Sequence, residues 1–161
     1  MKMTRGLLAV ALGAATLGGL ATARAKGSAG KLVETPAAEM KWEEFFPGGP
    51  VEAFMVGSKE AKKGPTAFFI KFKPGFDSGW HLHESAYTGI VLAGTLVETS
   101  KGSDEGKPLP AGSYYMQPSV VHKTQCVGTA ECMLYIYEEG KFSFIPTTEE
   151  GKPLPPPAKA K

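Results

Sequence analysis

Short hydrophobic runs separated by glycine, proline and polar residues fill the chain from about residue 31 to residue 147. Almost none of these runs repeats hydrophobic residues at helical i, i+3, i+4 spacing for three turns, which indicates an all-β protein. Turn sequences such as Pro74-Gly75 and Ala93-Gly94 separate the runs. Strands are expected at residues 51–56, 66–73, 81–85, 87–92, 96–100, 113–116, 121–125, 132–138 and 142–145. So many short strands favour a sandwich or a jelly-roll barrel, because a closed double layer hides strand edges.

The segments before and after these strands differ from them in composition. With 161 residues, the chain is long enough for one domain with a hydrophobic core and short for two. Residues 37–46 are expected to form either a short helix or an extended segment whose Trp42, Phe45 and Phe46 pack on the barrel. The last residues are rich in proline and lysine, which is typical of a flexible tail. The expected organisation is an arm, a barrel and a tail, at residues 26–50, 51–147 and 148–161.

The first 25 residues have the pattern of a secretory signal peptide. Lys2 and Arg5 precede an uncharged run, and small residues at Ala23 and Ala25 suit cleavage after Ala25. A transmembrane anchor is the alternative, but most of the run is glycine or alanine, and no basic cluster follows it. We therefore expect cleavage of residues 1–25 and a periplasmic or secreted protein without a membrane anchor.

Cleavage would also change the charge of the chain. The whole sequence has 18 basic and 16 acidic side chains, with a formal net charge of +2. Removal of residues 1–25 takes away Lys2, Arg5 and Arg24 and no acidic residue, so the mature chain is close to neutral. A role in nucleic-acid binding therefore has no electrostatic support.

Three histidines are the first candidates for chemistry. His81 and His83 are two residues apart in an expected strand, so their imidazoles point to the same face. His122 lies in another expected strand, about forty residues later. A His-x-His pair in a strand is often a surface feature. However, imidazole suits zinc, copper and iron, and a pair with a third histidine supplies three sides of a coordination sphere.

Two segments around these histidines resemble the sequence motifs of the cupin family. The segment from Gly75 to His83, followed by Gly94, is similar to the first motif in residues and spacing. The segment from Gly112 to His122 is similar to the second motif. It is one residue shorter than the commonest form, lacks the usual glycine, and has Cys126 where asparagine is expected. The resemblance covers residues 65–137 and extends to small exported bacterial cupins without an assigned function.

The resemblance implies both a fold and a metal site. The implied fold is a double-stranded β-helix, the cupin jelly-roll barrel, as a single domain. The implied ligands of a metal ion inside the barrel mouth are His81, His83 and His122. The resemblance also implies a homodimer that forms through a barrel face, although no residue of the chain indicates one.

One position departs from the family pattern. Where cupins usually have a glutamate ligand, this chain has Tyr87, which strand alternation places on the same face as His83. Glu84 faces the other way and is a poor substitute ligand. The expected site has three neutral imidazoles and open positions for water, an anion or dioxygen. The Tyr87 phenol could bind the metal, fill space or donate a hydrogen bond to a bound ligand. The hydrogen-bonding role is preferred, because a free phenol keeps its proton near pH 7.

The expected cofactor is one divalent metal ion. A protein exported unfolded takes up its metal after export, where the affinity order favours copper or zinc over iron. Iron comes next, because three-histidine cupins that resemble thiol or diketone dioxygenases use it. No residue decides between these ions.

The two cysteines flank a turn. Cys126 and Cys132 are separated by five residues that include Gly128-Thr129, which indicates a hairpin with the two sulfurs on facing strands. In an oxidising compartment they are expected to form a disulfide. The alternative is a reduced Cys126 thiolate that reaches the barrel interior from the same strand face as His122.

These features give two main functional hypotheses. The first is a mononuclear metal oxidoreductase, of dioxygenase type, with Tyr87 as its catalytic residue and a small organic molecule as its substrate. The second is a non-catalytic periplasmic protein that binds a metal or a small ligand at the same site. Phe76 and Trp80 flank the first motif and are expected to line a small apolar pocket. A structural module with an empty barrel is the third reading, and it requires the histidine positions to be coincidental.

Overall fold

The computed structural model describes residues 32–103 and 106–155. The signal peptide expected at residues 1–25 lies outside this part of the chain. The chain divides into two units, Met1–Glu34 and Thr35–Lys161, and the second contains all the strands described below. Among the described residues, no helix has the length and the apolar character needed to span a membrane.

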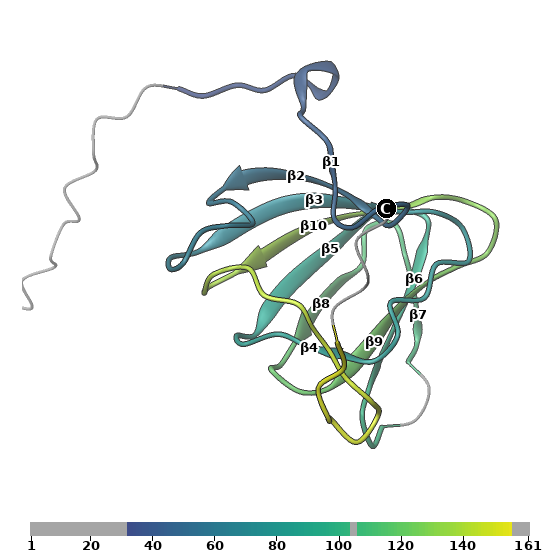
Figure 1. The fold of residues 1–161 in the computed structure, drawn as a ribbon. Coiled ribbons are helices and arrows are strands. Elements are labelled where there is room, and N and C mark those ends of the chain that lie inside the picture. Colours follow the sequence, from purple (N-terminus) through teal and green to yellow (C-terminus); the bar gives the residue numbers. More distant parts are fainter. Residues whose placement is uncertain (1–31, 104–105, 156–161) are drawn as a thin grey trace, which may run out of the picture. The chain divides into compact units, whose positions relative to one another are not determined.

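Two antiparallel sheets make up the second unit (Figure 1). The first sheet has the order β1-β2-β3-β10-β5-β8, formed by Glu43–Glu44, Val51–Val56, Thr66–Phe72, Cys132–Glu138, Tyr87–Ala93 and Tyr114–Gln117. The second has the order β11-β4-β9-β6-β7, formed by Ile145–Pro146, His81–Leu82, His122–Val127, Thr95–Ser100 and Pro108–Pro110. Many neighbouring strands are distant in sequence, as in a jelly roll. The all-β jelly-roll fold expected from the sequence is confirmed.

The hydrophobic core lies between the inner faces of the two sheets. In β3 and β10, alternate residues such as Ile70 and Leu134 are buried, and these two are cross-strand partners. Leu134 is also the partner of Val91 in β5, and Leu96 of β6 joins the same cluster from the second sheet. Each such side chain contributes about 1.5–3 kcal/mol by leaving water. This shared burial fixes which residues of every strand face the barrel interior.

The strands of the structure follow the expected strands closely in the core and less closely at the edges. Strands β2 and β10 have the expected bounds. Strand β4 ends at Leu82 rather than at residue 85, because the Glu84 N–H donates to the Ser143 hydroxyl instead of to a neighbouring strand. Strands β1 and β7 were not expected. Both lie at sheet edges, and β7 contains two prolines, which edge strands tolerate.

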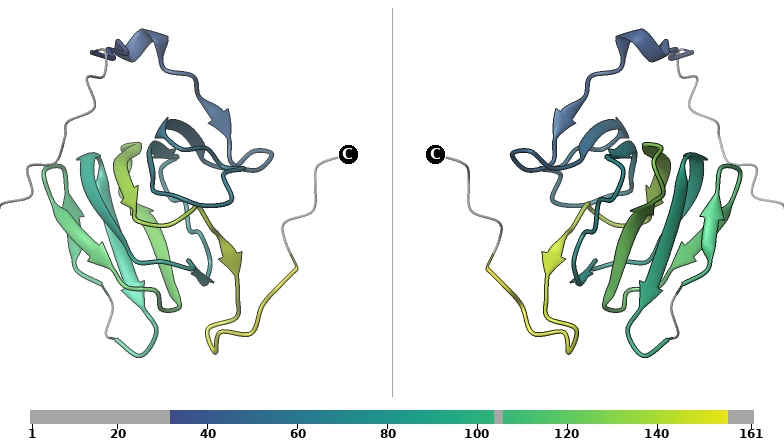
Figure 2. Two further views of the ribbon diagram at one scale, coloured as in Figure 1. Left: turned by 90° about the vertical axis from the view of Figure 1, so that its left-hand side faces the viewer. Right: turned by 90° about the vertical axis from the view of Figure 1, so that its right-hand side faces the viewer.

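The arm before β2 combines both of the expected conformations. Ala37–Glu39 form one turn of 3-10 helix, η1, and the chain then runs extended into β1. The Phe45 ring packs edge-on against the rings of Phe142 and Phe144, with centroid distances of 5.4 and 5.1 Å. The arm therefore contacts the segment before β11, which lies beside β4 (Figure 2).

The segment after β11 begins with a hydrogen-bonded turn. The Gly151 N–H donates to the Thr148 carbonyl, and the Leu154 N–H donates to the Pro146 carbonyl, with donor–acceptor distances of 2.9 and 2.8 Å. Thr147 and Pro153 form an isolated bridge. The first part of the proline- and lysine-rich segment is therefore folded back against β11, which the composition did not reveal.

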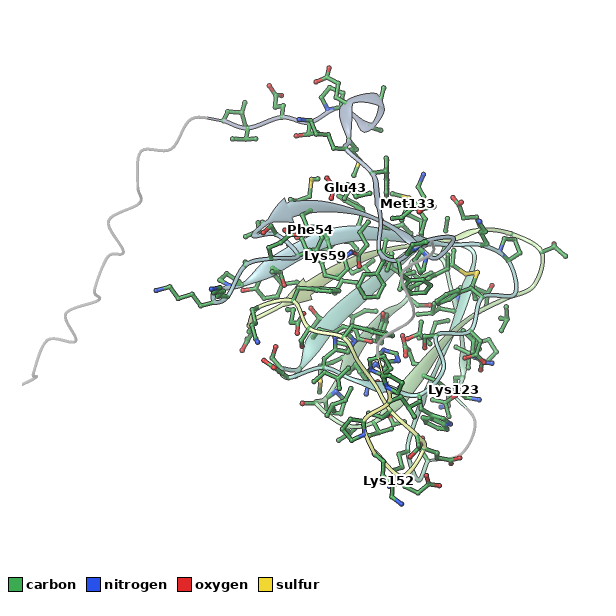
Figure 3. All side chains as sticks on the ribbon, viewed as in Figure 1. Glu43, Phe54, Lys59, Lys123, Met133 and Lys152 are labelled. Carbon is green, nitrogen blue, oxygen red and sulfur yellow. A yellow bond between two sulfur atoms is a disulfide. The ribbon has the colours of Figure 1, made fainter. Side chains whose placement is uncertain are left out.

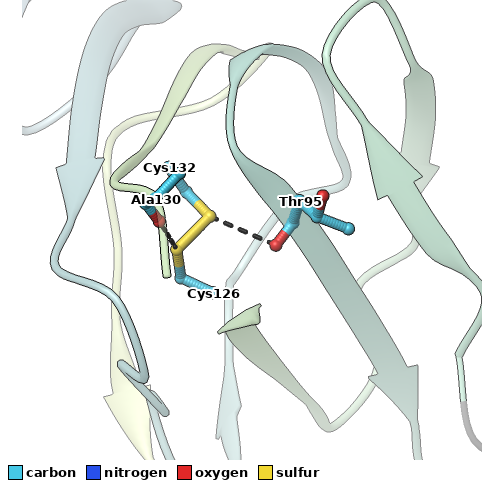
Figure 4. Close-up of a disulfide and its surroundings, with 4 residues drawn as sticks. All are labelled: Thr95, Cys126, Ala130 and Cys132. Atoms are coloured by element: carbon cyan, nitrogen blue, oxygen red, sulfur yellow. Dashed lines mark hydrogen bonds between the residues drawn. A yellow bond between two sulfur atoms is a disulfide. The ribbon is translucent and has the colours of Figure 1, made fainter. Parts of the chain in front are cut away.

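A disulfide joins Cys126 of β9 to Cys132 of β10 (Figure 4). The Cys126 sulfur lies 3.5 Å from the Ala130 carbonyl oxygen, and the Cys132 sulfur lies 3.2 Å from the Thr95 carbonyl oxygen. Both half-cystines are buried. The expected disulfide is confirmed, and a Cys126 thiolate is excluded because no cysteine is free. The expected hairpin is wrong, because β9 and β10 lie in different sheets and the disulfide links one sheet to the other.

Candidate metal centre

The three histidines meet on the inner side of the barrel. His81 of β4 is the cross-strand partner of His122 of β9, and His83 follows β4 by one residue. One ligand atom from each ring lies within 4.8 Å of those of the other two. The ring centroids are 4.2 Å apart for His81 and His122 and 5.4 Å apart for His83 and His122. The structure therefore brings together the three histidines that the sequence singled out.

Burial keeps these imidazoles neutral. It is the largest cause that lowers the pKa of His81 to about 2 and of His83 to about 3, and the neighbouring rings lower both further. Burial also lowers the pKa of His122, against the opposing effect of its hydrogen bond to Val120. A neutral imidazole offers a lone pair, which is the form that binds a metal ion.

Backbone carbonyls orient two of the rings. Nδ1 of His122 lies 2.9 Å from the Val120 carbonyl oxygen, and Nδ1 of His81 lies 3.1 Å from the Gly79 carbonyl oxygen. A carbonyl only accepts, so Nδ1 carries the proton in each neutral ring and Nε2 keeps the lone pair. Metal-binding histidines are commonly held this way, with the second nitrogen donating to a carbonyl.

The third ring has an unmet polar atom. Nδ1 of His83 is buried and has no hydrogen-bond partner among the described residues. A buried nitrogen without a partner costs about 1–3 kcal/mol, so such atoms usually have a bound group or a water nearby. The neutral rings, the carbonyl-held tautomers and this unpartnered nitrogen fit a divalent ion that prefers imidazole.

Tyr87 of β5 lies beside the histidines. Its hydroxyl oxygen is 3.1 Å from Nε2 of His122, and its ring centroid is 4.9 Å from that of His83. Burial, followed by the nearby Glu98, raises the Tyr87 pKa well above its ordinary value, so the phenol keeps its proton and donates to His122. Metal binding at Nε2 of His122 would break this hydrogen bond and free the Tyr87 hydroxyl.

A pocket that is partly open to solvent adjoins the site. His81, His83 and Tyr87 form one part of its wall. Phenyl rings form much of the remainder: Phe45, Phe46, Phe68, Phe72, Phe76, Phe142 and Phe144. The expectation that Phe76 lines an apolar pocket is met, whereas Trp80 is not part of this wall and lies under the Lys123 ammonium.

Three glutamates in the pocket wall were missed by the sequence reasoning. Burial raises the pKa of Glu98 to about 8, and hydrogen bonds from Thr124 and Tyr115 partly offset this effect. Burial also raises the pKa of Glu138 to about 7, although its carboxylate accepts a hydrogen bond from Ser85 at 2.9 Å. Glu52 has a pKa raised to about 7 by burial and lowered slightly by Lys59. Strand alternation could have found two of them, because Glu98 shares a face with Leu96, and Glu52 with Phe54.

Glu84, by contrast, points away from the site. It forms an exposed ion pair with Lys141, with an N···O distance of 2.9 Å. Among the described residues, the group that could hold a metal ion contains His81, His83 and His122 and no carboxylate. The arrangement therefore differs from a site with two histidines and one carboxylate.

Comparisons with known proteins agree with this fold. Residues 50–153 match the model of a family described as "Domain of unknown function (DUF4437)". No curated protein matches the chain. An RmlC-like cupin from Ralstonia eutropha is similar with a TM-score of 0.60 and 14% identity, covering 78% of this chain and 78% of that chain. KdgF from Halomonas sp. is similar with a TM-score of 0.54 and 17% identity, covering 68% of this chain and 94% of that chain. The DMSP lyase DddQ from Ruegeria pomeroyi is similar with a TM-score of 0.57 and 17% identity, covering 71% of this chain and 64% of that chain.

Proposed function

The chain belongs to the DUF4437 family and has the cupin fold, and from this premise we propose that it is an exported metal-dependent enzyme. Its metal ligands would be His81, His83 and His122, and its substrate a small organic molecule held in the barrel pocket. The proposed reaction class is that of an oxidoreductase of dioxygenase type.

One observation carries the proposal: three neutral imidazoles converge where two of them line an internal pocket. Structural zinc sites are closed by four protein ligands, whereas catalytic sites have three and leave a position open. Among the described residues, no fourth histidine, cysteine or carboxylate joins the group. Pockets with apolar walls and a few polar groups are typical of small-molecule sites.

Copper or zinc would fit the imidazole ligands best, and iron next. When bound, such an ion supplies Lewis-acid polarisation, and copper or iron also supplies electron transfer. The remaining functions belong to the chain itself. The phenyl rings exclude water, and His81 and His122 are already oriented by carbonyls.

Tyr87 is the proposed catalytic residue. Its buried phenol holds a proton at neutral pH and, once free of His122, could donate a hydrogen bond to a substrate oxygen. Glu98 accepts a hydrogen bond from the Thr124 hydroxyl at 2.9 Å, and Tyr115 also hydrogen-bonds to it. This carboxyl also holds a proton near neutral pH, so the wall offers two proton donors beside the histidines.

The test begins with protein purified from the periplasm of its own organism. Elemental analysis is expected to give one copper, zinc or iron ion per chain, and none in a His122→Ala variant. Oxygen uptake is then measured with thiols, flavonoids and diketones, and the metal spectrum is recorded during anaerobic substrate addition. An intact metal site that shows neither uptake nor a spectral change would contradict the oxidoreductase assignment.

A second candidate is a binding protein that holds the metal or a small ligand without reaction. It is favoured by the composition of the pocket wall, because phenyl rings bind ligands but do not transfer protons. In that case the metal would raise the melting temperature and one metal would be preferred, with no turnover of any substrate. Weak, unselective metal binding without stabilisation would exclude this candidate as well.

Export is supported by the Cys126–Cys132 disulfide, because structural disulfides persist in oxidising compartments. Mass spectrometry of protein from the periplasmic fraction or the medium is expected to find an N-terminus at Lys26. A mature chain that begins at Met1 would contradict both the signal peptide and the proposed localisation.

A further inference from the structure

Glu52 is an unpaired carboxyl inside the barrel. Its residue is 2% exposed, and its Oε1 atom is buried without a hydrogen-bond partner among the described residues. Glu52 lies on β2 opposite Ile70 of β3, and both residues line the pocket. The side chain therefore faces the barrel interior, in the same pocket wall as His81 and His83.

Phenyl rings surround this end of the pocket. The Phe68 ring lies 5.0 Å from that of Phe54 and 5.4 Å from that of Phe142, measured between centroids. Phe142 in turn packs against Phe45 of the arm, at 5.4 Å. Phe45, Phe68 and Phe142 line the same pocket as Glu52. Glu52 therefore shares its pocket with these aromatic rings.

The Lys59 ammonium does not satisfy Glu52. The Lys59 ammonium donates to the Phe45 carbonyl at 2.6 Å and lies 4.8 Å from the centre of the Phe45 ring. It forms no ion pair with Glu52 within 4.0 Å, although its charge lowers the Glu52 pKa. Lys59 and Phe54 lie toward the same end of the barrel, away from Lys152 (Figure 3). The buried oxygen is therefore available to a group that enters the pocket.

A buried carboxylate is stabilised most by a partner that is both a hydrogen-bond donor and a cation. Aromatic rings also attract cations, by about 0.5–2 kcal/mol per contact. An ammonium group meets both requirements, whereas a hydroxyl group supplies only a hydrogen bond. We propose that Glu52 and the surrounding phenyl rings form a subsite for the ammonium group of a small organic amine. This names the substrate class of the proposed enzyme and rests on the proposed function for its catalytic meaning, but amine binding itself requires no metal.

The test uses the metal-free, full mature chain and two probes of equal size, n-butylammonium and n-butanol. Binding is measured by calorimetry at about pH 8, where Glu52 is ionised and an alkylammonium keeps its proton. We expect wild type to bind n-butylammonium about tenfold or more tightly than n-butanol, as a charge-assisted hydrogen bond requires. The Glu52→Gln variant is expected to lose this preference.

The matched control is Glu138→Gln, a second buried glutamate of the pocket wall whose carboxylate already accepts a hydrogen bond from Ser85. It is expected to keep the preference for the ammonium probe. Equal binding of both probes by wild type would overturn the proposal whether or not the variants fold, and so would a preference that survives in a folded Glu52→Gln variant. Zinc binding by wild type and Glu52→Gln is measured in parallel. If the amine preference is lost while zinc still binds, the result tests the subsite alone. If zinc does not bind while the preference remains, the result tests the metal site alone.

Discussion

At the scale of single residues, Tyr87 has the contact that most affects the chemistry of the site. Its hydroxyl donates to Nε2 of His122, the nitrogen that the Val120 carbonyl leaves free for a metal. The sequence left three roles open for this phenol: metal ligand, hydrogen-bond donor and space filler. The structure shows it as a donor, to a histidine in place of the expected ligand.

A Tyr87→Phe substitution separates these roles. The variant has no hydrogen bond at His122 for the metal to break, and such a bond is worth about 0.5–1.5 kcal/mol. We therefore expect zinc to bind the variant about two- to tenfold more tightly, while any catalytic turnover falls. Competition with a chelator measures the affinity. Weaker metal binding by Tyr87→Phe than by wild type would identify the phenol as a ligand instead.

At the scale of strands and turns, the disulfide ties β9 of the second sheet to β10 of the first, the strands that carry His122 and the centre of the core. Replacement of both Cys126 and Cys132 by alanine should lower the free energy of unfolding by about 2 kcal/mol, from the entropy of a short closed loop. Urea denaturation of the two proteins measures this difference. An unchanged midpoint and slope would show that the link between the two sheets needs no crosslink.

Gly94 is required at the turn between β5 and β6. Its backbone has a φ of 74°, and a Cβ atom there would lie 2.6 Å from the Glu131 carbonyl oxygen and 2.8 Å from the Cys132 sulfur. Gly94→Ala should destabilise the protein by more than about 1 kcal/mol, because it adds a collision to the backbone strain. Gly112→Ala is the control, since φ is 90° there and nothing lies within 4 Å. If the two variants melt at the same temperature, the collision of the added Cβ atom at position 94 does not lower the stability of the protein.

At the scale of the whole molecule, alternation of hydrophobic residues predicted the strands that cross the core, and the cupin-like motifs predicted that three histidines come together in a group that could hold a metal ion. The short edge strands β1 and β7 could not be predicted this way, because they are defined by their partners rather than by a buried face. Glu98 could have been found by alternation, because it shares a face with Leu96. Its hydrogen-bond partner could not, because the Thr124 hydroxyl comes from a strand 26 residues away.

The buried glutamates give the metal-free protein a specific dependence on pH. The folded-state pKa values of Glu52 and Glu138 are raised to about 7, and that of Glu98 to about 8, from 4.5. Between these values and 4.5 the folded state binds more protons than the unfolded state, so each group stabilises the fold at low pH and loses this effect as the pH rises. The histidines, whose pKa values are lowered, act in the opposite direction below about pH 6.5 and have no effect above it.

The free energy of unfolding of the metal-free protein should therefore fall as the pH rises from about 6.5 to 8, where only the glutamates titrate. Urea denaturation at several pH values across this range gives the slope. Glu52→Gln should make the slope shallower, because one of the three groups that release a proton on unfolding is removed, whereas Glu84→Gln, at an exposed ion pair, should leave it unchanged. Stability that does not fall with pH across this range would mean that these carboxyls are already ionised inside the barrel, because they would then release no proton on unfolding.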